Sequence, residues 1–398
     1  MRGLLIGSLD TFRRAKLGWR KLRGHSEADE FAEKTVSGKA WEEFCDTLKS
    51  AGGALQFPAT PQDPFSQAEG YRYLSRLTRA ALEAFIEHGD TRTPELHRLC
   101  HETIKLGADN PDNYYQSCNL DGQYTYRVSG TRGTIPYLSF ATKSGHYGEG
   151  GAMPPVGEID ASEMEFNADG TFEMILSREK QPGNWLQLPE GYCLFMVRQT
   201  HLDRETETIA DLTIECLDAE AHNEGEFSPE KLVSGLRSAG TFVAGAPILF
   251  AKWARDFQKH SNQLPQFSDE VSNRAGGDPN IAYYHSHWAL APDEALLIEA
   301  MPPQCEHWNF QLNNYWLESL DYTRHTIHTN KHLATYKPDG SVVVIVAHQN
   351  PAIPETNWIS TVGHELGTMC WRWVQASEKP VPKTRVVKFD DLASAIGQ

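Results

Sequence analysis

The chain has 398 residues, of which 40% are hydrophobic and 23% are charged, an ordinary composition for a globular protein. This length exceeds what one hydrophobic core usually supports, so we expect two or three domains. The formal net charge of −16 argues against nucleic acid as a partner, because an acidic body repels phosphate backbones.

Charge is distributed unevenly along the chain. Residues 1–24 contain seven Lys or Arg and one acid, so the rest of the chain carries −22. We expect this basic start to form a helix docked on the acidic body; peripheral contact with an anionic membrane is the alternative. The opening residues do not fit a signal peptide, and no apolar run approaches the roughly 20 residues of a membrane span. A cytoplasmic protein is therefore expected.

The seven cysteines are scattered along the chain, and no two of them form a C-x-x-C pair. This spacing predicts neither a disulfide framework nor a zinc knuckle. The pattern is typical of buried thiols in a reducing compartment, where free cysteine behaves as a small hydrophobic residue.

The first 108 residues are predicted to be helical. Ser26 can cap a first helix, and apolar residues then recur at roughly helical spacing as far as Leu48. A second helix is expected over residues 67–88. A third is expected from Thr93-Pro94 to Gly107, since proline favours the first turn of a helix.

Strand-like alternation begins near Asp109. Residues 124–130 and 134–140 predict two strands joined by a turn at Arg132-Gly133. The next segment, 144–158, contains five glycines and two prolines. It is predicted to be a loop, and its length suits a lid or a binding loop.

Two segments, near residues 165–200 and 333–374, carry the same hairpin turn, Asn-Trp pair and arginine-bearing strand in the same order. These features are Asp169-Gly170, Asn184-Trp185 and Arg198 in the first copy, and Asp339-Gly340, Asn357-Trp358 and Arg372 in the second. Agreement of three features in order indicates an internal duplication. We expect the shared features to hold the structure together, and function to lie where the copies differ.

The remaining segments complete the predicted organisation. Between the copies, residues 206–263 are predicted to be helical, with one helix capped at Ser228 and another over 251–259. A polar linker over 264–282 follows, and strands resume near Tyr283. Three regions are expected: a helical region over 1–108, a first β-sandwich repeat with appended helices over 109–263, and a second repeat with a C-terminal tail over 264–398.

Six stretches carry a resemblance to a known family. They are Asp109-Asn-Pro-Asp-Asn-Tyr-Tyr, Tyr126-Arg-Val-Ser-Gly-Thr-Arg-Gly, Asn184-Trp-Leu, Val197-Arg-Gln, Trp308-Asn-Phe-Gln-Leu-Asn-Asn-Tyr-Trp, and Asp339-Gly-Ser with Asn357-Trp. Over roughly residues 108–375 the chain resembles the bacterial domain-of-unknown-function 1214 family, the companion of the 1254 family.

The resemblance implies a fold but no reaction, because fold alone does not supply a function. It implies a jelly-roll-like β-sandwich. We therefore expect an α+β protein with an N-terminal helical region followed by two related jelly-roll-like β-sandwich units joined by helices. The doubled sandwich motif departs from the usual single one.

The first candidate site is the Trp and Arg pair of each repeat. An arginine on an apolar strand must meet acceptors, because an unpaired buried charge is costly. Arg198 and Arg372 could bind a substrate carboxylate bidentately, with Trp185 beside it. The alternative is structural: each arginine ties down the Asn-Trp loop of its own repeat.

A second candidate follows Arg198. On a continuing strand, His201, Asp203 and Glu205 would share a face, which brings an imidazole and two carboxylates together for acid–base chemistry. Tyr315 completes the candidate catalytic set of His201, Asp203, Arg198 and Tyr315. The alternative is a solvated strand end that runs into the next helix.

Two further clusters are noted. His285 and His287 lie on one face of a predicted strand, as ligands of a divalent metal in a jelly-roll enzyme would, although sixteen histidines make such pairs common by chance. Trp308, Asn314 and Trp316 combine large rings with an amide, which suits a ring-bearing substrate. The same residues also fit a sandwich core with a polar rim.

Three classes of function follow. The first is a cytoplasmic hydrolase or lyase that acts on a ring-bearing polar or anionic small molecule without a cofactor. The second is a metal enzyme built on His285 and His287, and the third is a non-catalytic small-molecule or carbohydrate binding or assembly module. Motifs for nucleotides or for a serine nucleophile are absent from the sequence. A homo-oligomer is expected.

Overall fold

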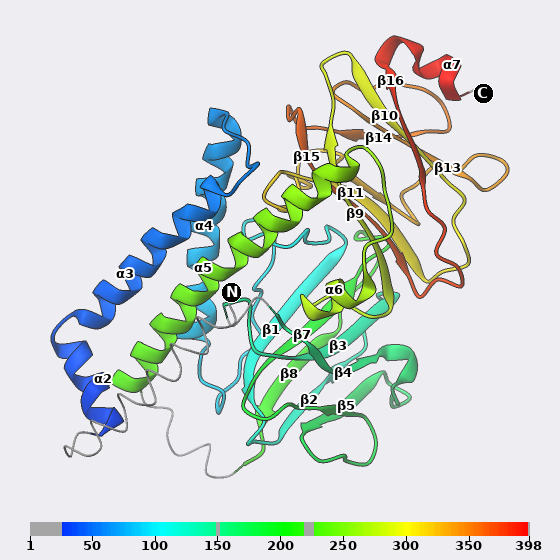
Figure 1. The fold of residues 1–398 in the computed structure, drawn as a ribbon. Coiled ribbons are helices and arrows are strands. Elements are labelled where there is room, and N and C mark those ends of the chain that lie inside the picture. The colour runs from blue at the N-terminus through cyan, green and yellow to red at the C-terminus, as the bar shows by residue number, and fades with distance from the viewer. Residues whose placement is uncertain (1–25, 149–151, 219–226, 397–398) are drawn as a thin grey trace.

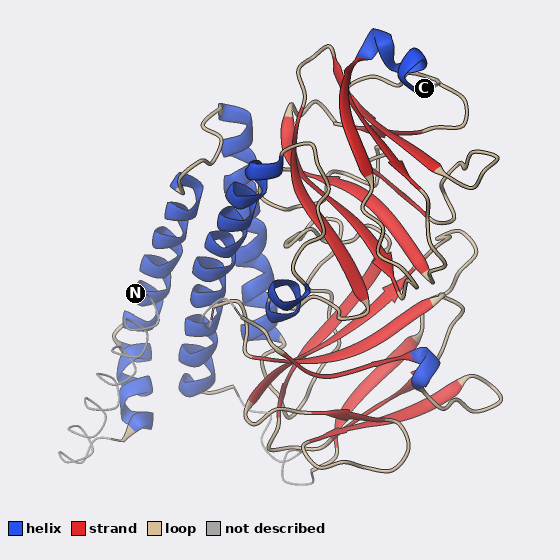
Figure 2. Cartoon of the chain, turned by 45° about the vertical axis from the view of Figure 1, so that its right-hand side comes forward, coloured by secondary structure: helices blue, strands red, loops and turns tan. Residues whose placement is uncertain are grey.

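The computed structural model describes residues 26–148, 152–218 and 227–396. The basic segment 1–24 and the centre of the predicted lid loop, 149–151, lie outside these described residues. Helices gather on one side of the molecule, and two groups of strands lie beside them, one above the other (Figure 1 and Figure 2).

The predicted helix over residues 67–88 is confirmed, whereas the first, expected to run from Ser26 as far as Leu48, is divided in two at Ser37-Gly38, where Gly38 has a positive φ of 78°. Helix α2 (Glu27–Val36) begins after Ser26, whose hydroxyl accepts a hydrogen bond from the Asp29 N–H at 3.1 Å. Helix α4 (Pro64–Leu82) begins after Asp63, three residues before the expected start, because the Asp63 carboxylate caps the helix. Between them lies α3 (Lys39–Ala51). The short elements η1 (Gly52–Gln56) and η2 (Glu83–Glu87) follow α3 and α4.

The third predicted helix, from Thr93 to Gly107, is wrong. His97 instead forms a β-bridge with Ser117, with backbone hydrogen bonds of 2.9 and 3.0 Å in the two directions. Gly107 and Ala108 both have a positive φ, which ends any helical path. Pairing with the edge of the following sheet therefore outweighs the proline signal at Pro94.

The two helices predicted between the repeats form one helix, α5 (Pro229–Phe257). Its small residues let neighbours approach closely: a Cβ at Gly240 would lie 3.1 Å from Thr47 of α3. Helices α2 to α5 bury one shared apolar core, and we call them the helical layer. Residues 229–260 form the one described helix that is long and apolar enough to cross a membrane. Half of its most apolar window is buried, as in the core helix of a globular protein.

The region predicted to be helical over 206–263 also contains a strand, β8 (Asp211–Cys216). Its backbone pairs with β2 (Tyr126–Thr131), so sheet formation outweighs local helix preference there. The remaining helical elements are short: η3 (Ala161–Glu163), η5 (Gln258–His260), α6 (Asp269–Arg274), η6 (Phe389–Asp391) and α7 (Leu392–Ile396).

The first β-sandwich has two four-stranded sheets, ordered β1-β7-β3-β4 and β6-β5-β2-β8. Their other strands are β1 (Asn113–Asp121), β3 (Tyr137–Ser144), β4 (Pro155–Asp160), β5 (Thr171–Ser177), β6 (Trp185–Gln187) and β7 (Tyr192–Thr200). Apolar side chains of both sheets form one buried core between them.

The second β-sandwich repeats this topology, with sheets ordered β12-β11-β15-β9 and β14-β13-β10-β16. The strands are β9 (Ile281–Ala289), β10 (Glu294–Ala300), β11 (His307–Asn313), β12 (His328–Asn330), β13 (Val342–Ala347), β14 (Asn357–Ser360), β15 (Leu366–Val374) and β16 (Lys383–Lys388). Each strand corresponds to the one eight places earlier. The predicted architecture of two related sandwich units joined by helices is confirmed.

The Asn-Trp pairs hold the turn of each repeat. The Asn184 side chain bonds the backbone of Glu165 and Glu173, and the Asn357 side chain bonds the equivalent backbone of Thr335 and Val343. Neither asparagine has a hydrogen bond to the arginine of its own repeat, because β6 and β14 lie in the sheet opposite the arginine-bearing strands. The predicted tie between each arginine and its own Asn-Trp loop is therefore wrong.

Candidate functional site

A cavity of about 140 Å³ lies where the helical layer meets the first sheet and the junction between the two sandwiches. Its walls are mostly apolar and aromatic, and include Phe85, Leu99, Leu106, Tyr147, Leu194, Met196, Phe242, Phe250 and Trp253. Its polar part contains Arg198 and Arg372, one from each repeat. The structure thus brings together two arginines that are 174 residues apart in sequence.

The two arginines occupy equivalent positions in their sheets. Arg198 of β7 lies opposite Tyr115 of β1, and Arg372 of β15 lies opposite Tyr283 of β9. Both tyrosines also line the cavity. Burial raises the pKa of Tyr283 to about 12, so its hydroxyl stays protonated at neutral pH.

Each arginine reaches into the loop that precedes the first strand of the other repeat. We call residues 107–112 and 276–280 the first and second lead-in loops. Arg198 of the first repeat donates to the carbonyl of Gly276 at 2.7 Å. Arg372 of the second repeat donates to the carbonyl of Ala108. The arginines therefore join the two sandwiches to each other rather than bracing their own repeat.

Arg198 belongs to a buried group of charges. Its Nη1 atom lies 3.5 Å from Asp278 and 3.9 Å from Glu158. Lys143, also buried, lies 3.5 Å from Glu158 and donates to the Gly277 carbonyl at 3.0 Å. Burial lowers the Lys143 pKa to about 8, and burial with the nearby Asp278 charge raises the Glu158 pKa to about 7.

Arg372 has neutral partners. Its Nη1 donates to Gln311 at 2.6 Å and to Asn309 at 3.3 Å, and Nη2 donates to the carbonyl of Ala108. Its guanidinium lies over the Tyr283 ring, 5.7 Å from the centroid. Among the described residues no carboxylate forms an ion pair with it.

Three histidines line the cavity and are held neutral. Burial lowers the pKa of His97 and His146 to about 4, and burial with the Arg372 charge lowers that of His285 to about 3. Asp109 also lines the cavity, but both of its carboxylate oxygens accept hydrogen bonds from Ser319. The arginines are thus the cations that face the cavity at neutral pH.

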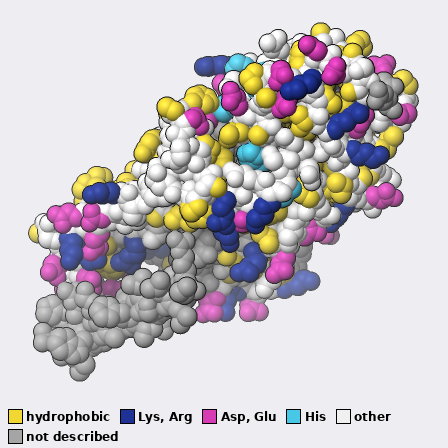
Figure 3. Space-filling view, turned by 45° about the horizontal axis from the view of Figure 1, so that its top comes forward, with side chains coloured by type: hydrophobic (Ala, Val, Ile, Leu, Met, Phe, Trp, Pro, Cys, Tyr) yellow, Lys and Arg dark blue, Asp and Glu magenta, His cyan; other side chains and the backbone are white. Residues whose placement is uncertain are grey.

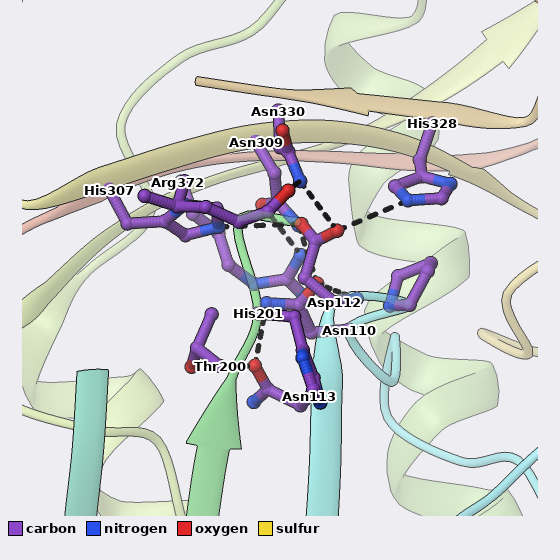
Figure 4. A network of polar contacts seen from close by, with 12 residues as sticks. Asn110, Asp112, Asn113, Thr200, His201, His307, Asn309, His328, Asn330 and Arg372 are labelled. Carbon is purple, nitrogen blue, oxygen red and sulfur yellow. Dashed lines mark hydrogen bonds and ion pairs between the residues drawn. The ribbon is translucent and has the colours of Figure 1, made fainter. Parts of the chain in front are cut away.

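Asp112 of the first lead-in loop forms a second polar cluster at the junction (Figure 4). Its carboxylate lies 3.2 Å from His328 and 3.3 Å from His307, and accepts from Asn309 and Asn330. Burial acts to raise the Asp112 pKa, but the imidazoles outweigh it and hold the pKa far below its usual range. All four partners belong to the second sandwich, so Asp112 fastens the first repeat to it.

The predicted acid–base set is not brought together. Strand β7 ends at Thr200, so the shared face predicted for His201, Asp203 and Glu205 is wrong. The His201 N–H still donates to the Asp112 carbonyl in register with β1, but the chain then turns at residues 202–206, where the Asp203 carboxylate accepts from the N–H of Glu205. Among the four candidate catalytic residues, Arg198 alone lines the cavity.

The predicted aromatic site is mostly core. Tyr315 and Trp316 are buried within the helical layer, where Tyr315 donates to the Ala59 carbonyl and Trp316 to the Ser66 carbonyl. Trp308 lies in the core of the second sandwich, and Asn314 holds the following turn through the Trp316 N–H. Trp185 donates to Ser177 on the outer sheet. None of these residues lines the cavity.

The side chains of His285 and His287 have different surroundings. His285 lines the cavity between the rings of Tyr283 and Phe257, parallel to both within 6°. His287 bonds the Ser261 hydroxyl at 2.8 Å through Nδ1. Within the described residues, no group of three or more His, Cys, Asp or Glu side chains is placed to hold a metal ion.

Sequence reasoning missed the two tyrosines and the lead-in loops. The available signal was a shared Asn-Pro or Asp-Pro pair, Asn110-Pro111 and Asp278-Pro279. In each repeat the N–H of the first residue donates to the hydroxyl of the tyrosine five positions later, Tyr115 or Tyr283. Each pair therefore marks the start of its repeat.

Surface charge adds no second site on the face drawn in Figure 3, where described acidic and basic side chains are interspersed. The charged side chains described above differ from these surface charges, because they are buried at the junction of the two sandwiches.

The sequence matches a family model described as "Protein of unknown function (DUF1214)" twice, at residues 114–199 and 295–378. An uncharacterized protein from Burkholderia cenocepacia, known from its crystal structure, is 48% identical, with a TM-score of 0.87. The match covers 90% of this chain and 99% of that one. The VPA0106 protein from Vibrio parahaemolyticus matches over 86% of this chain and 100% of its own, at 11% identity and a TM-score of 0.44. No curated protein matches the sequence.

Proposed function

The chain belongs to the DUF1214 family of unknown function, and because that family supplies no reaction we propose a function from the cavity: the protein binds a small organic anion with an apolar body. One observation carries the proposal. Two buried arginines, from equivalent strands of the two repeats, line a cavity whose other walls are aromatic and aliphatic. Guanidinium groups recognise carboxylates and phosphates through paired hydrogen bonds.

Donors remain available on the arginines. The Nη1 atom of Arg198 is buried and has no hydrogen-bond acceptor among the described residues. A guanidinium carries five N–H donors, and the contacts of Arg372 use three of them. Buried donors without acceptors are rare in folded proteins, so an anionic ligand supplies what the chain leaves unmet.

The volume and the lining of the cavity determine which kind of anion would fit in it. Its volume of about 140 Å³ is close to that of an engineered apolar cavity of about 150 Å³ that holds benzene. Phe242, Phe250 and Trp253 of α5 form one side, where an apolar body would be buried. A benzene ring or a short alkyl chain with one acidic group fits both features.

Calorimetric titration of the purified full-length protein with benzoate, octanoate and uncharged benzyl alcohol tests the proposal. We expect benzoate or octanoate to bind at least tenfold more tightly than benzyl alcohol, because hydrogen bonds to a charged group contribute about 1.5–3 kcal/mol. Failure of both anions to bind would contradict the proposal.

A space-filling variant locates the binding. Met196 lines the cavity two positions before Arg198, on the same face of β7. Met196→Trp should abolish binding by filling the cavity. Met301, 54% exposed and outside the cavity, gives the matched control: Met301→Trp should leave the affinity unchanged. Equal binding by both variants would place the anion elsewhere.

A further inference from the structure

The two halves of the junction are built on the same plan but carry different charges. Asn110 and Asp278 hold the same position in the two lead-in loops, since the N–H of each donates to the tyrosine five residues later. Each side chain also accepts a hydrogen bond from the facing sheet: Asp278 from Ser139, and Asn110 from Asn309. One repeat therefore supplies a carboxylate where the other supplies an amide.

The half that contains Arg198 balances its own charge. The cations Arg198 and Lys143 face the carboxylates Asp278 and Glu158 within 3.9 Å. Tyr137 also donates to Asp278, at 3.1 Å. The charges of this half are therefore close to balanced, and the unmet Nη1 donor of Arg198 needs a hydrogen-bond acceptor rather than a counter-charge.

The half that contains Arg372 lacks that balance. Arg372 is 4% exposed, and the acceptors of its guanidinium are two amide oxygens and one backbone carbonyl. Two carboxylates lie nearby, but neither forms an ion pair with Arg372. Asp109 accepts from Ser319 and acts on Arg372 only through space, and Asp112 pairs with His307 and His328. A buried cation without a carboxylate is costly.

Parallel rings run away from Arg372. The guanidinium lies over Tyr283, Tyr283 stacks on His285 with centroids 5.6 Å apart, and His285 stacks on Phe257 at the same distance. Trp253 lies 6.3 Å from His285 and also lines the cavity. An aromatic body bound at Arg372 would lie beside this wall.

From this asymmetry we infer that the ligand is an aromatic monoanion whose acidic group pairs with Arg372, while Arg198 serves mainly to join the repeats. The inference rests on the proposed function and names the charge and orientation of the ligand. One negative charge neutralises Arg372, the guanidinium of the cavity that has no ion-paired carboxylate among the described residues. A second charge would meet a group of residues that is already balanced.

A ligand series on the unchanged protein tests the charge. Benzoate and phthalate share a ring and differ by one carboxylate. Calorimetry should give benzoate an affinity at least tenfold above that of phthalate. Tighter binding of phthalate would overturn the inference and leave the proposed function standing. Failure of benzoate, octanoate and phthalate alike to bind would remove both.

Exchanging the charges at the equivalent positions tests the location. Asn110→Asp gives Arg372 the carboxylate that Arg198 already has, and should weaken benzoate binding roughly 10- to 100-fold. Asp278→Asn removes the carboxylate from Arg198, and should improve phthalate relative to benzoate. Unchanged benzoate affinity in a folded Asn110→Asp variant would overturn the assignment to Arg372. If either variant fails to fold by circular dichroism, the benzoate–phthalate comparison on the unchanged protein still decides the inference.

Discussion

The first and second lead-in loops meet the opposite sheet through equivalent atoms, yet they place their carboxylates differently. In the second loop Asp278 lies beside Arg198. In the first loop that position is Asn110, and the carboxylates are Asp109, which accepts from Ser319, and Asp112, which pairs with His307 and His328. The two repeats thus share the same hydrogen bonds at the junction but differ in the positions of their carboxylates. This difference leaves Arg372 without an ion-paired carboxylate in the described part of the chain, and available to a ligand.

The largest expected difference between the halves is in the free energy of unfolding that is lost when each arginine is replaced. Arg198→Met leaves Asp278 buried without its cation, whereas Glu158 keeps Lys143, and should lower the free energy of unfolding by about 3–5 kcal/mol. Arg372→Met leaves only neutral acceptors unpaired and should cost about 1–3 kcal/mol. Urea unfolding at pH 7 measures both. Equal losses would show that the two arginines serve the same purpose.

Asp112 should make the fold sensitive to acid. Its pKa lies far below the unfolded value of about 3.9, so its carboxylate contributes stability above that pH and loses it as the pH falls. Asp112→Asn should cost about 3 kcal/mol at pH 7, since it leaves the imidazoles without their anion. It should also flatten the decline in stability below about pH 4. An undiminished acid decline in the variant would assign that decline to other carboxyl groups.

Glu158 should have the opposite effect on the pH dependence of stability. Its pKa is raised from 4.5 to about 7, so the folded state holds a proton that the unfolded state releases, and stability falls as the pH rises between those values. Glu158→Gln should remove a decline of about 1–3 kcal/mol over that range. Urea unfolding at pH 4.5, 6 and 7 measures it. A wild-type profile that rises throughout would contradict the prediction.

The smallest expected effects lie where the repeats agree. Asn184→Ala and Asn357→Ala each remove three hydrogen bonds to the backbone of the preceding turn. Asn357 is buried and Asn184 is partly exposed. The expected costs are therefore about 2 and about 1 kcal/mol, because water replaces lost partners at an exposed site. Thermal unfolding measures both, and neither change should alter benzoate affinity.

Local patterns in the sequence were enough to predict the two sandwiches. The Asp-Gly turns, the Asn-Trp pairs and the apolar strands that carry Arg198 and Arg372 repeat in order, and the structure places each at an equivalent position. These features depend on contacts within one repeat. Their periodicity and turn chemistry therefore appear directly in the sequence.

Contacts between the repeats could not be predicted in the same way. Arg372 reaches Ala108, 264 residues away, and nothing in its own strand indicates that partner. The prediction of a third helix was wrong for a related reason, since His97 pairs with the edge of β1 rather than with its own neighbours. The prediction of an acid–base face at His201 was wrong because the chain turns at residues 202–206, where the Asp203 carboxylate bonds its own backbone neighbour.

A crystal structure of the full-length protein with 4-iodobenzoate, located by the anomalous signal of iodine, tests the pairing of the ligand with Arg372 most directly. We predict a carboxylate within about 3 Å of the Arg372 guanidinium and iodine among the aromatic side chains of α5. An empty cavity with iodine bound elsewhere, or a carboxylate paired with Arg198 alone, would contradict the account.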